Sequence, residues 1–242
     1  MTGGMAAIER VSMADRAADA ILKLIVDERL RDGDSLPSSQ EMSRRLDVSI
    51  VVVREALASL AGRGILVRRQ GREPVVSLPG HEILSSILRI RAYQDAIGVD
   101  EFQECRAALE VHIAGLAACA GAAEDRRAAL EPPLAGMRTA RTAEAFNESD
   151  LALHHALAAL SGNRAMTLML GTLNHVIRES LALSYARVER KLGPKGIERA
   201  LEMHDAVCEA VVRGDAAAAR HAMQEHFQYS LTATTGRARS SG

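Results

Sequence analysis

The sequence predicts a mainly α-helical protein, with an N-terminal unit of helices and one small β-hairpin, and a C-terminal all-α antiparallel helical bundle. Three observations predict this fold. Hydrophobic residues make up 48% of the 242 residues but aromatic residues only 2%, so the core is aliphatic. Such Ala-rich sequence favours helix. Strand-like runs occur only before residue 78, and after it Gly and Pro separate segments of helical periodicity.

The first part begins with a helix over residues 13–31, where apolar residues recur close to the 3.6-residue period. The segment 33–37, Gly-Asp-Ser-Leu-Pro, ends this helix. Ser38 then caps a short second helix that ends near residue 46, with Glu41 at the spacing of a capping box. Ser49 caps a third helix that continues to about residue 61.

Two short strands follow, at residues 65–68 and 74–77, joined by a turn at 70–73. Two short helices joined by a tight turn and followed by a hairpin form a winged helix-turn-helix, whose second helix can enter the major groove of DNA. We therefore expect a DNA-binding domain at 11–78, a linker at 79–81, an all-helical domain at 82–233 and a disordered tail at 234–242.

No strand signal follows residue 80, and the periodic segments there are long enough to form one helical bundle. Pro132 and Pro133 are placed to split one helix, and Gly193-Pro194 to separate two others. We expect helices at about 82–97, 101–120, 123–140, 142–160, 164–190, 195–213 and 215–233.

Charge and cysteine usage narrow the class of protein. The net charge is −1, but residues 44–72 hold seven Arg against Asp47 and Glu55, a local net charge of +5. The three cysteines, Cys105, Cys119 and Cys208, are far apart, so we interpret them as buried thiols rather than disulfides. No apolar run has the length of a membrane span, and a signal peptide is missing. We expect a cytoplasmic protein with no membrane partner.

The stretches Gly33–Ser38, Leu46–Ser49, Val53–Leu57 and Gly64–Leu66 closely resemble the DNA-binding domain of the GntR family, within a similarity that covers residues 13–70. The resemblance implies a double-stranded DNA operator as partner. Helix N-termini offer backbone N–H groups to phosphates, and the wing of this family reaches toward the minor groove. The expected contact residues are Ser38, Arg44, Arg45, Ser49, Ile50, Val51, Arg54, Arg69 and Arg72.

The chain also departs from the family pattern at DNA-facing positions. Ile50 and Gln40 stand where basic residues are usual, and Val52 replaces a usual Pro. The wing reads Gly-Arg-Glu-Pro at 71–74 in place of Gly-x-Gly-Thr. Either Ile50 and Val51 contact thymine methyl groups, or the chain reads a different site from its relatives.

Residues 101–233 resemble the FCD ligand-binding domain of the FadR subfamily. The matched residues include Arg106, Glu110, Asp150, His154, Ser161-Gly162-Asn163, His204, Gly214-Asp215, Met223 and His226. In that domain the metal ligands fall at four positions, filled here by Asp150, His154, His204 and His226. Members that hold acyl-CoA instead of a metal lack this set of histidines.

The chemistry of the four residues agrees with the resemblance. Asp150 and His154 are four residues apart and share one helix face, and a bundle brings His204 and His226 into the same core. One carboxylate and three imidazoles suit a divalent transition metal, Zn first, with Ni, Mn or Fe as alternatives. An open coordination position can bind the carboxylate of an effector. His155, His175 and His221 match no ligand position.

Arg106 is the expected effector-binding residue. It lies beside an apolar stripe, where a charge is costly unless paired, and its planar fork suits a carboxylate. Its partner is therefore either a small organic acid or a neighbouring acidic residue such as Glu110 or Glu148.

Together these features predict a DNA-binding transcription regulator, a repressor by the family's commoner mode, controlled by a small carboxylate at a metal site. We expect a homodimer on a palindromic operator, joined by the apolar C-terminal helices. Two alternatives stay open. One is a metal-dependent hydrolase, although no nucleophile or general-base motif accompanies the histidines. The other is a DNA-binding protein whose helical domain only dimerises.

Overall fold

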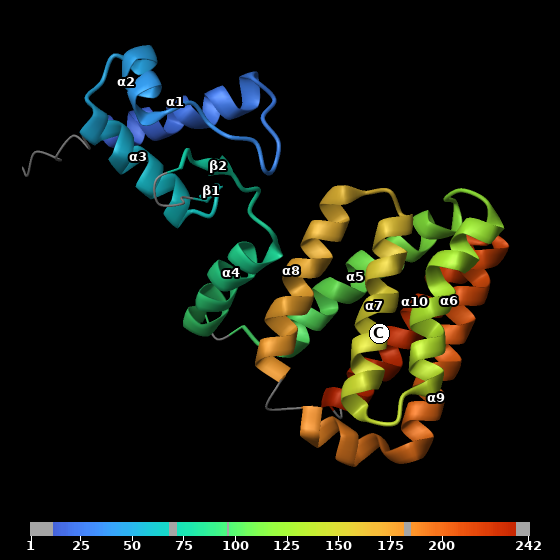
Figure 1. Ribbon diagram of the computed structural model, residues 1–242. Coiled ribbons are helices and arrows are strands. Elements are labelled where there is room, and N and C mark those ends of the chain that lie inside the picture. Colours follow the sequence, from blue (N-terminus) through green and yellow to red (C-terminus); the bar gives the residue numbers. More distant parts are fainter. Residues whose placement is uncertain (1–11, 68–71, 96, 182–184, 236–242) are drawn as a thin grey trace, which may run out of the picture. The chain divides into compact units, whose positions relative to one another are not determined.

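The computed structural model describes residues 12–67, 72–95, 97–181 and 185–235, and Figure 1 shows its helices and strands. The chain divides into two compact units, Met1–Ile83 and Leu84–Gly242. Each unit has its own hydrophobic core, so each is described separately. No helix in the described ranges is long and apolar enough to cross a bilayer.

The smaller unit contains α1 (Met13–Asp27), α2 (Ser39–Leu46), α3 (Ile50–Gly62), β1 (Leu66–Val67) and β2 (Val75–Val76). The two strands pair antiparallel, with Leu66 opposite Val76. Local capping sets both helix starts of the helix-turn-helix, because the hydroxyls of Ser38 and Ser49 accept bonds from the amides of Glu41 and Val52. The core packs α1 against α3 and includes Ala17, Ile21, Met42, Val53, Leu57 and Leu60.

The first helix ends four residues earlier than the sequence predicts, at Asp27 instead of residue 31. Arg29 has a positive φ of 53°, and the amide of Leu30 then bonds back to the carbonyl of Ile25 at 2.9 Å. This left-handed closure satisfies the last carbonyls of the helix. Leu30 lies outside the helix but still packs against the core. Its place in the apolar pattern therefore reflects burial and does not indicate that the helix extends this far.

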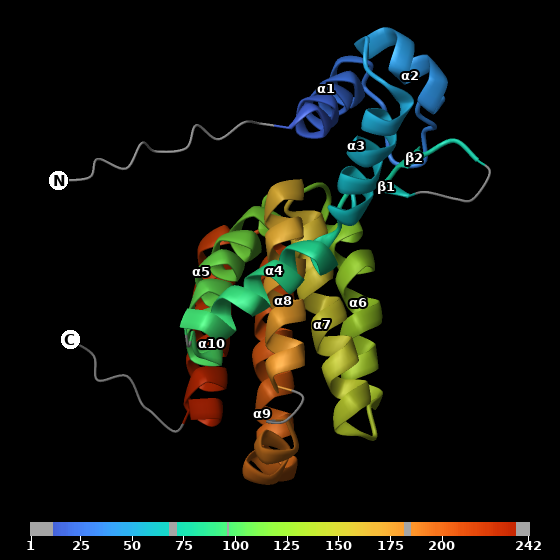
Figure 2. The same cartoon turned by 90° about the vertical axis from the view of Figure 1, so that its left-hand side faces the viewer.

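The larger unit contains α4 (His81–Asp95) from Leu84 onward, α5 (Val99–Ala118), α6 (Ala123–Thr139), α7 (Ala143–Leu160), α8 (Arg164–Leu181), α9 (Tyr185–Arg213) and α10 (Ala216–Thr235). Helix α5 packs against α7, α8, α9 and α10, and α6 packs against α7 and α9. In Figures 1 and 2 the helices α6 to α9 run nearly side by side. The mainly α-helical fold with a two-stranded wing is therefore confirmed.

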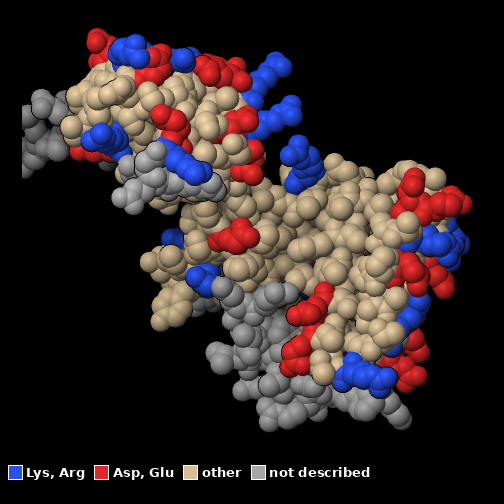
Figure 3. Space-filling view, viewed as in Figure 1, with Lys and Arg blue, Asp and Glu red and all other residues tan. Residues whose placement is uncertain are grey.

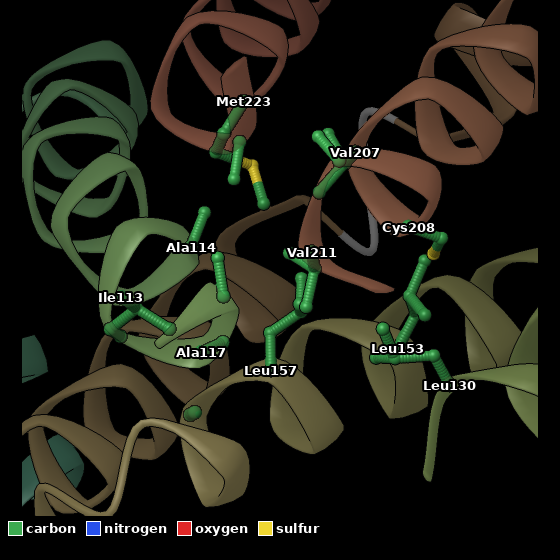
Figure 4. Close-up of a cluster of buried hydrophobic side chains, with 14 of the residues drawn as sticks. Ile113, Ala114, Ala117, Leu130, Leu153, Leu157, Val207, Cys208, Val211 and Met223 are labelled. Atoms are coloured by element: carbon green, nitrogen blue, oxygen red, sulfur yellow. The ribbon is translucent and has the colours of Figure 1, made fainter. Parts of the chain in front are cut away.

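The core of this bundle is aliphatic, as the composition predicts. Figure 4 shows side chains from five helices meeting in it. Ile113 from α5, Leu157 from α7 and Val211 from α9 are fully buried, so the core fixes the rotation of the helices that carry the functional side chains. Other members are Ala114, Ala117, Leu130, Leu153, Val207, Cys208 and Met223.

The predicted break at Gly193-Pro194 is wrong, and the possible split of the helix predicted at 123–140 does not occur. Helix α6 runs through Pro132 and Pro133, and α9 continues through residues 193–194, so the break between α8 and α9 falls earlier in the chain. A proline inside a helix costs about 3 kcal/mol. In α6 the burial of Leu130, Leu134 and Met137 on one face offsets that cost.

Two of the three cysteine predictions also need correction. Cys208 is buried in the bundle core, but Cys105 and Cys119 are exposed. Cys105 lies on the outward face of α5, and Cys119 caps its C-terminus, where the helix leaves the core. The predicted tail begins two residues early, because α10 reaches Thr235, and residues 236–242 lie outside the described part.

Candidate metal centre and nucleic-acid interface

Three histidines from three helices meet inside the bundle. His154 comes from α7, His204 from α9 and His226 from α10, and one nitrogen of each lies within 4.8 Å of the others. Their side chains are buried, with exposures of 0%, 2% and 6%. Since these residues are up to 72 positions apart in the printed sequence, the bundle packing alone brings them together.

Asp150 joins this cluster from one turn earlier on α7. Its Oδ1 lies 2.8 Å from Nε2 of His204 and 3.7 Å from Nε2 of His154. Donor atoms that share one ion at bond lengths of about 2.1 Å lie about 3–3.5 Å apart. The structure thus brings all four predicted ligand residues to one place.

The second nitrogen of two imidazoles is already engaged. Nδ1–H of His204 donates to the carbonyl of Ala200 at 2.7 Å, and Nδ1 of His154 contacts the carboxylate of Glu110. Such partners fix the tautomer, so that Nε2 presents its lone pair. Nε2 of His154 and Nδ1 of His226 are buried without a hydrogen-bond partner, and Nε2 of His204 is buried with the carboxylate of Asp150 2.8 Å away but without a hydrogen bond of good geometry. Buried unsatisfied nitrogens are costly, and a divalent ion would satisfy all three.

The pKa shifts of Asp150 and His226 favour the protonation states in which these residues bind a metal. Burial alone would raise the pKa of Asp150, but the imidazoles of His154 and His204 hold it well below its usual range. Burial, reinforced by the neighbouring imidazoles, lowers the pKa of His226 well below its usual value. Asp150 is therefore ionised and His226 neutral near pH 7, the forms that bind a metal.

The pKa of His154 is shifted in the direction that opposes metal binding. Burial would lower its pKa, but the facing carboxylates of Glu110 and Asp150 outweigh burial and raise the pKa to about 9. A proton therefore competes with a metal ion for this nitrogen below about pH 9.

Glu110 belongs to the candidate site, although the sequence did not single it out as a site residue. Its side chain is fully buried, and its two oxygens contact Arg106 and His154 separately. Burial would raise its pKa, but His154 and Arg106 lower it, so it is a buried carboxylate that orients a candidate ligand. The sequence shows only its i, i+4 spacing to Arg106, which suggested a salt bridge.

Arg106 is buried at 9% exposure on α5. Its Nε donates to Oε1 of Glu110 at 2.6 Å, and its guanidinium carbon lies 5.3 Å from the centre of the Phe227 ring. The structural salt bridge with Glu110 is therefore present, whereas Glu148 is exposed. The pair links Arg106 to His154 through one carboxylate, which places the guanidinium next to the candidate metal centre.

Most of the predicted DNA-contacting residues lie on or next to α2 and α3, and some of their basic side chains are paired. Arg54 and Val51 are exposed on α3, Ile50 is half-buried and Arg72 is exposed. Arg44 contacts Glu41 at 2.6 Å, and Arg45 bridges Glu41 at 3.0 Å and Glu28 at 3.2 Å. These pairs are solvent-exposed and therefore weak. Arg69 lies outside the described residues.

Comparison with known proteins decides the family. Residues 13–76 match the bacterial regulatory proteins of the gntR family, and residues 101–229 match the FCD domain. The chain belongs to the GntR family. Its FCD domain places it with the FadR-like regulators, as the sequence predicts.

Individual relatives agree with this assignment. The GntR-family chain is 31% identical over 213 residues to the HTH-type transcriptional regulator LutR of Bacillus subtilis, covering 84% of this chain and 93% of LutR. It is 26% identical over 225 residues to the putative L-lactate dehydrogenase operon regulatory protein of Escherichia coli, covering 90% and 84%. Among solved structures, Streptococcus agalactiae GntR matches with a TM-score of 0.67 and 28% identity, covering 90% and 98%.

The protein is therefore a DNA-binding transcription regulator with an FCD effector-binding domain, and it is not an enzyme. This result removes the hydrolase alternative.

Proposed function

We propose that this GntR-family regulator binds one divalent transition metal through Asp150, His154, His204 and His226. The observation that supports the proposal is the set of three buried imidazole nitrogens that make no hydrogen bond of good geometry, gathered beside the ionised carboxylate of Asp150. Imidazole and carboxylate ligands suit Zn, with Ni, Mn and Fe as alternatives. When bound, the ion supplies a Lewis-acidic position that holds an anionic ligand.

The proposed effector is a small organic acid. Its carboxylate takes the open position at the metal, and Arg106, held by Glu110, binds its other polar end. One relative is named as a regulator of the L-lactate dehydrogenase operon, so lactate and other short hydroxycarboxylates are the first compounds to test. We further propose that effector binding relieves repression, and that the operator is contacted by the exposed face of α3, the N-termini of α2 and α3, and the wing.

Metal analysis and a thermal-shift screen test this proposal together. Protein purified without chelator or His-tag should carry about one metal ion per chain, and a short hydroxycarboxylate should raise Tm only while the metal is present. A protein that is metal-free yet still responds to acids would be a metal-free ligand binder. A protein with neither property would have a helical domain that only dimerises.

We expect Glu110→Gln to weaken metal binding by about 10- to 100-fold, the usual effect of losing the partner of a ligating histidine. Gln keeps the volume of the side chain but removes the charge that orients His154 and Arg106. A competition titration with a metal-binding dye measures the change. Glu148→Gln, at an exposed position on α7, is the matched control. Equal affinities in the two variants would remove Glu110 from the site.

We also expect a homodimer, because a single helix-turn-helix buries too little surface for useful specificity and a pair reads two half-sites. Sedimentation velocity at micromolar concentration should give twice the chain mass of 26.0 kDa. A monomer both with and without operator DNA would contradict this expectation.

A further inference from the structure

Val51, the second residue of α3, is an aliphatic side chain that the core of its unit does not use. Residues 50–53 are all aliphatic. Val53 is fully buried in the core and Val52 packs against it, whereas Val51 is 63% exposed. The buried face of the helix consists of Val53, Ala56, Leu57 and Leu60. At 100° per residue, Val51 points about 170° away from the middle of that face.

The exposure of this valine brings the unit no gain in stability. A β-branched side chain loses rotamer freedom in a helix, and in solvent no burial offsets that loss. Ile50, its neighbour, is half-buried and points about 100° away from it. Of these two aliphatic side chains, Val51 is therefore the one that lies in the middle of the exposed face of α3.

The residues that surround Val51 on this face suit the base edges of DNA. Arg54 and Glu55 are exposed one turn later, about 60° to one side of Val51 and about 40° to the other. Ala58, in the following turn, is exposed and small, so the helix can approach a groove closely. The carboxylate of Glu55 is repelled by phosphates but can accept a hydrogen bond from N4 of cytosine. The exposed face therefore fits base edges better than it fits the phosphate backbone.

Charge alone does not give this unit a sequence preference. Arg44 and Arg45 both contact Glu41, and in Figure 3 positive and negative side chains are mixed on the visible face of the smaller unit. Phosphate contacts position a protein on DNA, whereas sequence is read at the base edges. The side chains in the middle of the exposed face of α3 are therefore the ones that select a sequence.

We propose that Val51 reads the 5-methyl group of a thymine in the major groove. The inference rests on the proposed contact between the operator and the exposed face of α3. The thymine methyl is the apolar group that base edges present in this groove, and a recognition helix contacts base edges with its N-terminal residues. Contact with the two methyl groups of Val51 removes apolar surface from water on both sides. Cytosine lacks the methyl group, so Val51 distinguishes T·A from C·G at one position.

Replacement of thymine by uracil tests the proposal, because uracil lacks only the 5-methyl group. An operator is first selected with the full-length wild type from random duplex DNA, and each of its thymines is then replaced singly by uracil. We expect at least one position at which uracil raises the Kd of the wild type about fourfold, the usual effect of losing one buried methyl group. The same replacement should leave the Kd of Val51→Ser nearly unchanged, since Ser has no methyl group to contact it.

A second measurement adds the methyl group instead of removing it. At the position found with uracil, the wild type should bind 5-methylcytosine about fourfold more tightly than cytosine, and Val51→Ser should bind both equally. Val26→Ser is the matched control, because it changes a valine of 73% exposure on α1, and it should keep the wild-type response to uracil. Both substitutions are at exposed positions, so the far-UV circular dichroism spectra should match that of the wild type.

Two results would overturn the proposal and leave operator binding intact. One is an operator whose thymines can all be replaced by uracil without loss of affinity. The other is a uracil effect of equal size in the wild type and Val51→Ser. A wild type that selects no sequence from the random DNA would overturn the proposal together with the proposed operator contact.

Discussion

Replacing His204 with Ala is expected to reduce bound metal from about one ion per chain to a trace. The candidate ligands lie on α7, α9 and α10, so an ion that binds them ties three helices together. Loss of one buried imidazole leaves His154 and His226 without a shared partner. A bound ligand at 100 times its Kd stabilises a protein by about 2.7 kcal/mol, or about 5–10 °C in Tm for a chain of this size.

Elemental analysis is the deciding measurement, and thermal melts with and without chelator support it. Removing a buried side chain lowers Tm by itself, so the informative quantity is the change in Tm caused by the chelator. That change should be large in the wild type and absent in His204→Ala. His155→Ala is the matched control, because His155 neighbours a ligand but is exposed and points about 100° away.

The pH dependence of metal binding should follow the site's protonation. With the pKa of His154 raised to about 9, protons compete with the ion throughout the neutral range, so metal affinity falls as pH drops from about 9. Metal content that is substoichiometric, and equal in the wild type and His204→Ala, would leave the domain as a metal-free ligand binder.

Local signals made the helix starts predictable. Ser38 and Ser49 each cap the helix that the sequence assigned to them, because an N-cap bond joins residues only three apart. Helix ends and breaks were less predictable, because tertiary packing decided them. Pro132 and Pro133 remain inside α6 because its other face is buried, which no window of local sequence reveals.

The four candidate ligands were predictable from a resemblance, but their surroundings were not. Contact between Glu110 and His154 joins residues 44 positions apart, and it depends on the rotation of α5 against α7. That rotation is set by core residues such as Ile113 and Leu157. A resemblance to a family can therefore identify candidate metal ligands from the sequence. The residue that orients a ligand can be identified only from the packed structure of the bundle.

Replacing Arg54 with Ala is expected to abolish specific operator binding while leaving the fold intact. Arg54 is exposed near the N-terminus of α3, beside the buried stripe of Val53, Ala56 and Leu57, so no core contact is lost. Loss of one good base contact costs about 1–3 kcal/mol, or about 5- to 150-fold in Kd. Gln40 and Ile50 stand where the family usually has basic residues. We therefore expect Arg54 to contribute a larger part of the free energy of operator binding than it would beside those basic residues.

Titrations against operator and unrelated DNA at several salt concentrations separate base reading from phosphate binding. If Arg54 reads a base, Arg54→Ala weakens operator binding and leaves binding to unrelated DNA nearly unchanged. If it binds only phosphate, both affinities fall together and the salt dependence drops by about one counterion. Arg63→Ala, at the exposed C-cap of the same helix, is the matched control. An Arg54→Ala protein that retards operator DNA as well as the wild type would show that another part of the unit reads the site.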